Sequence, residues 1–133
     1  MYRISSKTHG LLDYVVGGAI AALPYVVKCN DSTKRVLHAA GWGAAAYSIF
    51  TDYERGLVKA LPMQAHLTLD ALSGAGLITA AVLLDDETPQ NRALLAGIGA
   101  FEIAVTAMSS TEAYTDDESP AAAERIAEYV SPS

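Results

Sequence analysis

The 133-residue sequence has few charged side chains and a single cysteine. Charged residues make up 18% of the chain, while 51% of its residues are hydrophobic; soluble domains carry about 25% charged residues. Because Cys29 stands alone, an internal disulfide and a thiolate zinc site are excluded. The net charge is −6 and no basic stripe is present, which argues against nucleic acid as a partner.

Four apolar stretches account for most of the hydrophobic residues. They span residues 11–27, 36–50, 65–84 and 93–108, with short polar connections between them. Each is about 15 to 20 residues long, close to the length at which a helix crosses a hydrocarbon core about 30 Å thick. The stretches show no strand alternation and are long for strands. We predict an all-α, integral membrane four-helix bundle over residues 1–110, in contact with the lipid bilayer, followed by an acidic tail over residues 111–133.

Two alternatives compete with this interpretation. A soluble four-helix bundle would need a polar face on each helix, yet residues 41–50 and 71–84 contain no charge. Residues 1–22 could instead be a signal peptide, with Arg3 and Lys7 as its basic start and residues 19–21 as a cleavage site. Asp13 interrupts the apolar region that such a peptide requires.

The sequence contains an internal repeat. His9 and Asp13 are followed by Gly17, and His66 and Asp70 are followed by Gly74, at an offset of 57 residues. Residues 40–44 (AGWGA) match residues 96–100 (AGIGA) at an offset of 56, as if one residue were lost in a loop. The pattern predicts two tandem helical-hairpin repeats, about 9–54 and 66–110, related by a pseudo-twofold axis along the membrane normal.

Small residues recur at four-residue spacing along these helices. In lipid, small side chains let helix backbones approach closely, and van der Waals contact then holds the helices together. The alternative is that alanine and glycine are simply abundant. The predicted packing residues are Gly17, Gly41, Ala44, Gly74, Gly97 and Ala100.

A polar constellation interrupts the apolar stretches. A histidine and an aspartate four residues apart share a helix face, and the His9–Asp13 and His66–Asp70 pairs begin the first and third helices. Glu102 lies in the middle of the fourth helix. A carboxylate at mid-membrane costs about 2.5–3.5 kcal/mol, so we expect these groups to have a use. The candidates are hydrogen bonds that fix helix register, a metal or haem site, and a proton or small-ion relay.

Three segments carry a resemblance to a known family. Residues 7–14 (KTHGLLDY), 47–54 (YSIFTDYE) and 62–70 (PMQAHLTLD) resemble the SPW-repeat membrane proteins of bacteria, and the similarity covers about residues 3–108. At the position of the family's Ser-Pro-Trp motif this chain has Leu23, Pro24 and Tyr25. The resemblance implies a four-helix bacterial membrane protein and implies no activity.

No nucleophile or cofactor motif is recognisable in the sequence. We therefore predict a non-enzymatic structural or accessory subunit, in a homo-oligomer or a larger membrane complex, with a cofactor-binding, metal-binding or proton-relay protein as the alternative. The expected location is the bacterial cytoplasmic membrane. Basic residues divide equally between the two sides of the predicted bundle, and Arg125 favours cytoplasmic termini. The tail is either a solubilising segment or carries a short docking helix over residues 120–130.

Overall fold

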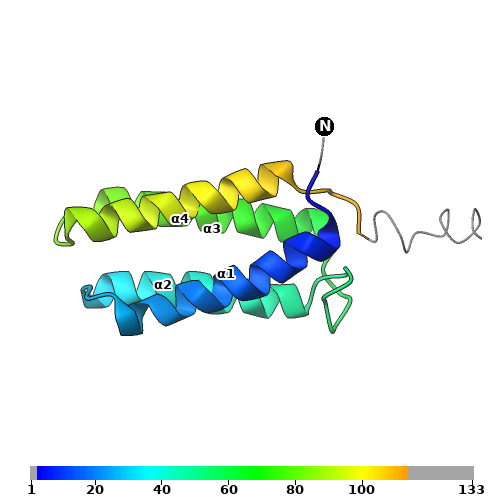
Figure 1. Cartoon of the computed structure of the whole chain (residues 1–133), viewed down its shortest axis with the longest axis horizontal. Helices are drawn as coiled ribbons and strands as arrows, with labels where there is room; N and C mark the ends of the chain where they lie inside the picture. Colours follow the sequence, from blue (N-terminus) through cyan, green and yellow to red (C-terminus); the bar gives the residue numbers. More distant parts are fainter. Residues whose placement is uncertain (1–2, 114–133) are drawn as a thin grey trace, which may run out of the picture.

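The computed structural model describes residues 3–113, which form four helices arranged as two antiparallel hairpins. The helices are α1 (Ser6–Val26), α2 (Asp31–Ile49), α3 (Met63–Leu83) and α4 (Pro89–Met108). Helix α1 packs on α2 and α3 packs on α4, and the two hairpins lie side by side (Figure 1). The predicted all-α fold of two helical hairpins is confirmed. The tail helix predicted over residues 120–130 lies outside the described residues.

Local sequence explains where the helices begin. The side chains of Ser5, Asn30 and Thr88 each accept a hydrogen bond from the backbone N–H three residues later, which satisfies a donor that the first helical turn leaves open. Pro89 follows Thr88 at the first position of α4, where its missing N–H is no loss. Pro62 precedes α3 without a side-chain cap.

Glycines set the close approach of the helices within each hairpin. A Cβ atom added to Gly41 would lie 2.6 Å from the Gly17 carbonyl oxygen, and one added to Gly74 would lie 2.6 Å from the Gly99 carbonyl oxygen. Ala44 is also buried and lies against Gly17. Backbones at this separation tolerate no side chain, so these contacts depend on glycine.

The repeat register differs from the predicted one in the second helix of each hairpin. Gly99, and not Gly97, contacts α3, whereas Gly97 faces open space and Ala100 is exposed. Equivalent residues of α2 and α4 are 58 positions apart, as in the pairs Leu37 and Leu95, Gly41 and Gly99, and Thr51 and Ser109. The connection between α3 and α4 is therefore one residue longer than the connection between α1 and α2. The predicted offset of 56 was wrong because it rests on matching small residues, and of these only the pair Gly41 and Gly99 remains matched at the offset of 58 that the packing uses.

The interior of the bundle has an apolar layer and a polar layer. Ile20, Leu37, Leu77 and Leu95, one from each helix, form the buried apolar layer between the hairpins. The polar layer lies toward the end of the bundle at which α1 and α3 begin. There the chain pairs in parallel at two isolated bridges, Ile4 with Ser109 and Thr51 with Leu61. Each bridge joins the end of a second helix to the residues before a first helix, so the two repeats correspond at these ends as well.

Glu87 ties the two hairpins together at the opposite end. Its carboxylate accepts hydrogen bonds from the backbone N–H of Asn30 at 2.9 Å and of Thr88 at 2.8 Å. The side-chain amide of Asn91 donates a third at 2.9 Å. Burial acts to raise the pKa of this carboxyl group, but the neighbouring Thr33 side chain and these bonds outweigh it and lower the pKa to about 2. Glu87 is therefore an ionised clamp at neutral pH.

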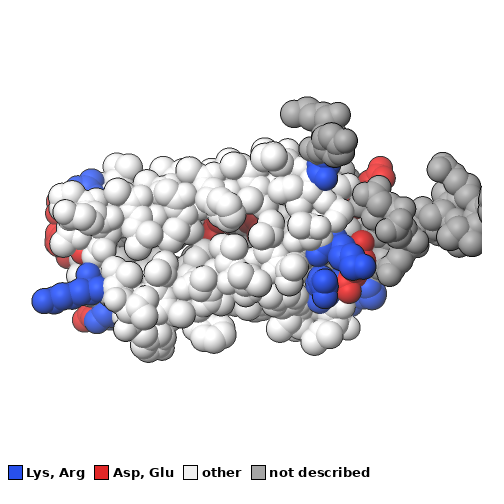
Figure 2. All heavy atoms as spheres, viewed as in Figure 1, with Lys and Arg blue, Asp and Glu red and all other residues white. Residues whose placement is uncertain are grey.

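Basic residues and exposed large apolar side chains occupy different parts of the surface. Figure 2 shows Lys and Arg only near the two ends of the visible face. Large apolar side chains such as Trp42, Leu72 and Val82 are more than half exposed. Two helices, α1 and α3, are long and apolar enough to cross a membrane.

On the side where α1 faces α4, a groove of about 500 Å³ with an apolar lining separates the hairpins.

Candidate metal centre

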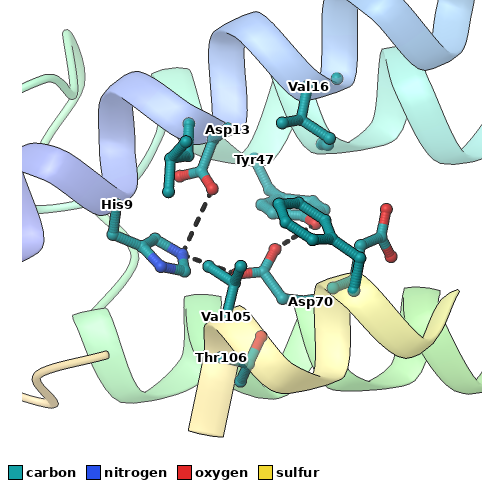
Figure 3. Close-up of a pocket in the computed structure, with 12 residues that line it drawn as sticks. His9, Asp13, Val16, Tyr47, Asp70, Val105 and Thr106 are labelled. Carbon is teal, nitrogen blue, oxygen red and sulfur yellow. Dashed lines mark hydrogen bonds and ion pairs between the residues drawn. The ribbon is translucent and has the colours of Figure 1, made fainter. Parts of the chain in front are cut away.

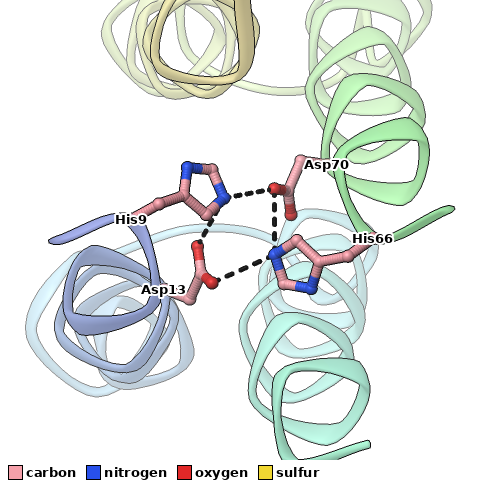
Figure 4. A group of neighbouring side chains, drawn as sticks. All are labelled: His9, Asp13, His66 and Asp70. Carbon is pink, nitrogen blue, oxygen red and sulfur yellow. Dashed lines mark hydrogen bonds and ion pairs between the residues drawn. The ribbon is translucent and has the colours of Figure 1, made fainter. Parts of the chain in front are cut away.

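Four of the five predicted polar residues converge between the hairpins. His9 and Asp13 come from α1, and His66 and Asp70 come from α3 (Figure 4). His9 Nε2 lies 3.2 Å from Asp13 Oδ1 and 2.9 Å from Asp70 Oδ2. His66 Nε2 lies 3.0 Å from Asp13 Oδ2 and 3.3 Å from Asp70 Oδ2. Nitrogen and oxygen donors thus alternate around one point, and we call these four residues the His–Asp centre.

The centre is buried although all its members are polar. The exposed fraction is 1% for His9 and 0% for His66. The two carboxylate side chains are about one-tenth exposed. Two full negative charges placed this deep need compensation by positive charge or by donated hydrogen bonds.

The outer nitrogen of each histidine contacts a buried hydroxyl group. His9 Nδ1 lies 2.6 Å from Ser109 Oγ, and His66 Nδ1 lies 2.8 Å from Thr51 Oγ1. Each hydroxyl donates its only proton to the backbone carbonyl four residues earlier, Val105 for Ser109 and Tyr47 for Thr51, both at 2.7 Å. A hydroxyl whose proton is already committed can only accept. Both imidazoles therefore carry their proton on Nδ1 and donate it outward.

This arrangement leaves both Nε2 atoms beside carboxylate oxygens, and the 2.9 Å contact between His9 Nε2 and Asp70 Oδ2 has the geometry of a hydrogen bond. A neutral imidazole that is protonated on Nδ1 presents a lone pair at Nε2, and a lone pair facing a carboxylate is repulsive. His66 Nε2 is close to two carboxylate oxygens and yet makes no hydrogen bond of good geometry with either. Two arrangements resolve the conflict. Either both imidazoles are fully protonated, or a cation lies between the four donors.

The donor set fits a divalent transition metal. One ligand atom from each residue can be chosen so that all four lie within 4.8 Å of one another. Tetrahedral coordination with bonds of about 2.0–2.1 Å places ligand atoms about 3.3–3.4 Å apart, close to the observed nitrogen–oxygen separations of 2.9 to 3.3 Å. Imidazole and carboxylate ligands suit zinc, iron and related ions. Two aspartates would also neutralise the charge of a divalent ion.

Two tyrosines hold the carboxylates in place. The Tyr47 hydroxyl donates to Asp70 Oδ1, and the Tyr53 hydroxyl donates to Asp13 Oδ2 at 3.2 Å. Burial raises the pKa of the Tyr53 phenol well above its ordinary value, so this side chain is a neutral donor. Hydrogen bonds of this kind orient carboxylate ligands and are typical of the groups around a metal site.

Glu102, the fifth predicted residue, lies beside the centre and not in it. It lines a small pocket together with His9, Asp13, Asp70 and Val105 (Figure 3). Its Oε2 atom is buried and makes no hydrogen bond within residues 3–113, although the Ser73 side chain interacts with the carboxyl group. A molecule held in this pocket would therefore lie beside the Glu102 carboxyl group.

Sequence reasoning missed the two hydroxyl residues that fix the imidazoles. Thr51 and Ser109 lie within two residues after the second helix of each repeat, 58 residues apart. The predicted offset of 56 does not align them. With the correct register, a repeated hydroxyl beside a repeated His–Asp pair would have been a visible signal.

Comparison with protein-family models, with curated proteins and with solved structures gives no match. The resemblance to the SPW-repeat family stays a prediction.

Proposed function

We propose that this chain is a four-helix integral membrane protein that binds one divalent transition-metal ion at the His–Asp centre. The observation that carries the proposal is the orientation of the imidazoles. The Ser109 and Thr51 hydroxyls accept hydrogen bonds from the two Nδ1 atoms, and both Nε2 atoms lie within 3.3 Å of the carboxylates of Asp13 and Asp70. Metal-ligating histidines characteristically donate the other ring N–H in this way.

Membrane insertion of all four helices is supported by their length and by the placement of charge. A helix of 21 residues, such as α1 or α3, is about 32 Å long, which matches the hydrocarbon core. Helices α2 and α4 are more polar because Lys34, Arg35 and Arg92 lie in their first turns or just after. Those turns are at the end of the bundle, where a membrane interface accepts basic side chains.

Metal binding explains the centre better than the other two uses considered for it. Hydrogen bonds that fix register, or a proton relay, need an Nε2 proton aimed at a carboxylate. His9 Nε2 makes such a contact with Asp70 at 2.9 Å, whereas His66 Nε2 lies within 3.3 Å of both carboxylates and makes no hydrogen bond of good geometry with either. A single ion between the donors satisfies all four groups at once and leaves the buried site without net charge. The relay therefore stands as the competing function in the experiment.

The experiment is metal analysis of the purified protein in detergent or nanodiscs. After chelation, the protein is dialysed against Zn²⁺, Fe²⁺ or Mn²⁺, and bound metal is measured per chain. We expect one ion per chain, and much weaker binding in His66→Gln and Asp70→Asn. His38→Gln is the matched control, because His38 lies in α2 toward the opposite end and contacts Tyr25.

Uptake of no ion by the folded wild-type protein would overturn the proposal. So would wild-type affinity in both His66→Gln and Asp70→Asn. Circular dichroism shows whether each variant keeps its helices. In the apo protein, proton flux across vesicles that Asp70→Asn abolishes would favour the relay.

The predicted role as a non-enzymatic accessory subunit is compatible with a metal centre and stays a prediction. Purification from the native membrane at fixed stoichiometry with a larger assembly would support it.

A further inference from the structure

The two repeats differ at one side of the His–Asp centre. At the offset of 58, Tyr47 of α2 corresponds to Val105 of α4, and Ala44 corresponds to Glu102. The Tyr47 hydroxyl donates a hydrogen bond to Asp70, and the Tyr47 side chain lines the same pocket as Val105. Valine is smaller and lacks the hydroxyl, so the equivalent place in the second repeat is open. The pocket beside the centre is lined by Val105 and Glu102, and it lies where the symmetry is broken.

The pocket is of molecular size and adjoins the donors. Its volume is about 30 Å³, which is room for about two water-sized molecules. Its lining includes three of the four proposed metal ligands, His9, Asp13 and Asp70. A molecule held in the pocket would therefore lie next to the ion. A closed structural site has no such space on any side.

Glu102 gives the pocket a polar lining residue. The Ser73 side chain interacts with its carboxyl group, but its Oε2 atom is buried and makes no hydrogen bond within residues 3–113, and a buried acceptor without a donor is costly. A donor held in the pocket removes that cost. The acidic Glu102 side chain also makes the pocket unfavourable for anions.

An apolar route leads to the pocket from the side of the bundle. The groove between α1 and α4 shares Val16 and Phe101 with the pocket, and every residue that lines the groove is apolar or glycine. In the proposed membrane setting this groove faces lipid. Small neutral molecules that dissolve in the bilayer can reach it, whereas hydrated ions cannot.

From these observations we propose that the metal takes an exchangeable ligand from this pocket: a water-sized, neutral molecule that Glu102 contacts from the opposite side. This inference rests on the proposed metal binding. It makes the centre a reactive site with an open position, as in metal sites that exchange ligands, and it assigns that position to the side of α4.

Nitric oxide is a suitable probe because it is small, neutral and soluble in membranes. The full chain is loaded anaerobically with Fe²⁺, iron is measured per chain, and nitric oxide is titrated in. The electron paramagnetic resonance signal of a ferrous nitrosyl reports binding at the metal. We expect one nitrosyl per bound iron in the wild-type protein.

Val105→Tyr restores the residue of the other repeat and fills the pocket. We expect it to keep iron and to weaken nitric oxide binding by about tenfold or more, the size of effect that overpacking a filled site produces. Val82→Tyr makes the same change at a residue of α3 that is 65% exposed, and it should behave as wild type. If Val105→Tyr does not fold, Val105→Leu narrows the pocket by one methylene group and should still weaken binding.

The outcomes separate the two proposals. Stoichiometric iron without a nitrosyl in the wild-type protein overturns the open position and leaves metal binding standing. Wild-type nitric oxide affinity in the folded Val105 variants places the ligand elsewhere and also overturns this inference. Failure to bind iron or any other divalent ion overturns both proposals.

Discussion

Replacing Gly41 with alanine should separate the helices of the first hairpin. The added Cβ atom would lie 2.6 Å from the Gly17 carbonyl oxygen and 2.8 Å from the Ala21 Cα atom. Both neighbours are backbone atoms of α1, so no side-chain rotation can relieve the clash. Gly43 is the matched control, because a Cβ atom added there meets nothing within 4 Å.

The expected difference follows from two opposing effects. Alanine favours a helix over glycine by about 1 kcal/mol, and this gain applies to both positions. Overpacking costs about 1–3 kcal/mol and applies to Gly41 alone. Gly41→Ala should therefore lower the free energy of unfolding by up to about 2 kcal/mol, whereas Gly43→Ala should be neutral or stabilising.

The assay is unfolding in mixed micelles of a mild detergent and sodium dodecyl sulfate, followed by circular dichroism. Loss of stability in Gly41→Ala with none in Gly43→Ala is the expected result. Equal effects of the two substitutions would refute the close approach of α1 and α2 at Gly41, because the two changes differ only in what surrounds the new methyl group.

Three further predictions follow from the same contacts. Gly99→Ala should destabilise the second hairpin while Gly97→Ala should not, and the same micelle titration measures both; the reverse order would contradict the 58-residue register. Thr51→Val and Ser109→Ala should each weaken metal binding by about 10–100-fold while the helix content stays unchanged. Competition with a chromophoric chelator measures the affinity, and unchanged affinity in both variants would contradict imidazoles that are protonated on Nδ1. The pKa of the Glu87 carboxyl is about 2 in the folded protein against an ordinary value of 4.5, so its ionised form stabilises the fold above about pH 4.5 and this contribution is lost as the pH falls toward 2. The melting temperature of Glu87→Gln should therefore lie below that of wild type at pH 7, and the gap should shrink as the pH falls through that window; a constant gap would contradict the clamp.

The fold was largely predictable because its signals are local. Runs of apolar residues define the four helices, and short connections between them require antiparallel neighbours. The His9–Asp13 and His66–Asp70 pairs were found because histidine and aspartate four residues apart share a helix face. Their convergence followed from the repeat, since equivalent helices of two tandem hairpins begin at the same end of the bundle.

The register of α2 against α4 was not predictable from small residues alone. Glycine and alanine can pack in several registers. Only the close backbone contact between Gly99 and Gly74, which excludes any larger side chain, selects one of them. The helix-capping residues Asn30 and Thr88 stand at the correct offset of 58. Because a cap fixes where a helix begins, caps carry more register information in this chain than its abundant small residues.

The pocket lay beyond the reach of sequence reasoning. The depth of Glu102 could be predicted from its place in the fourth stretch, but its separation from the four central residues depends on how the hairpins face each other. The second repeat has Val105 where the first repeat has Tyr47, and the smaller valine leaves room for the pocket. Pairing these two residues requires the offset of 58, which only the structure supplies.

X-ray absorption spectroscopy of the zinc-loaded, full-length protein in nanodiscs identifies the atoms that bind the metal. The His–Asp centre predicts two imidazole nitrogens and at least two oxygens at about 2.0–2.2 Å, with no sulfur, because Cys29 lies in the connection between α1 and α2 at the far end of the bundle. Loss of imidazole scattering in His9→Gln and in His66→Gln should accompany loss of zinc. A zinc site with sulfur ligands, or one that keeps two imidazoles in both variants, would contradict metal binding between the two hairpins.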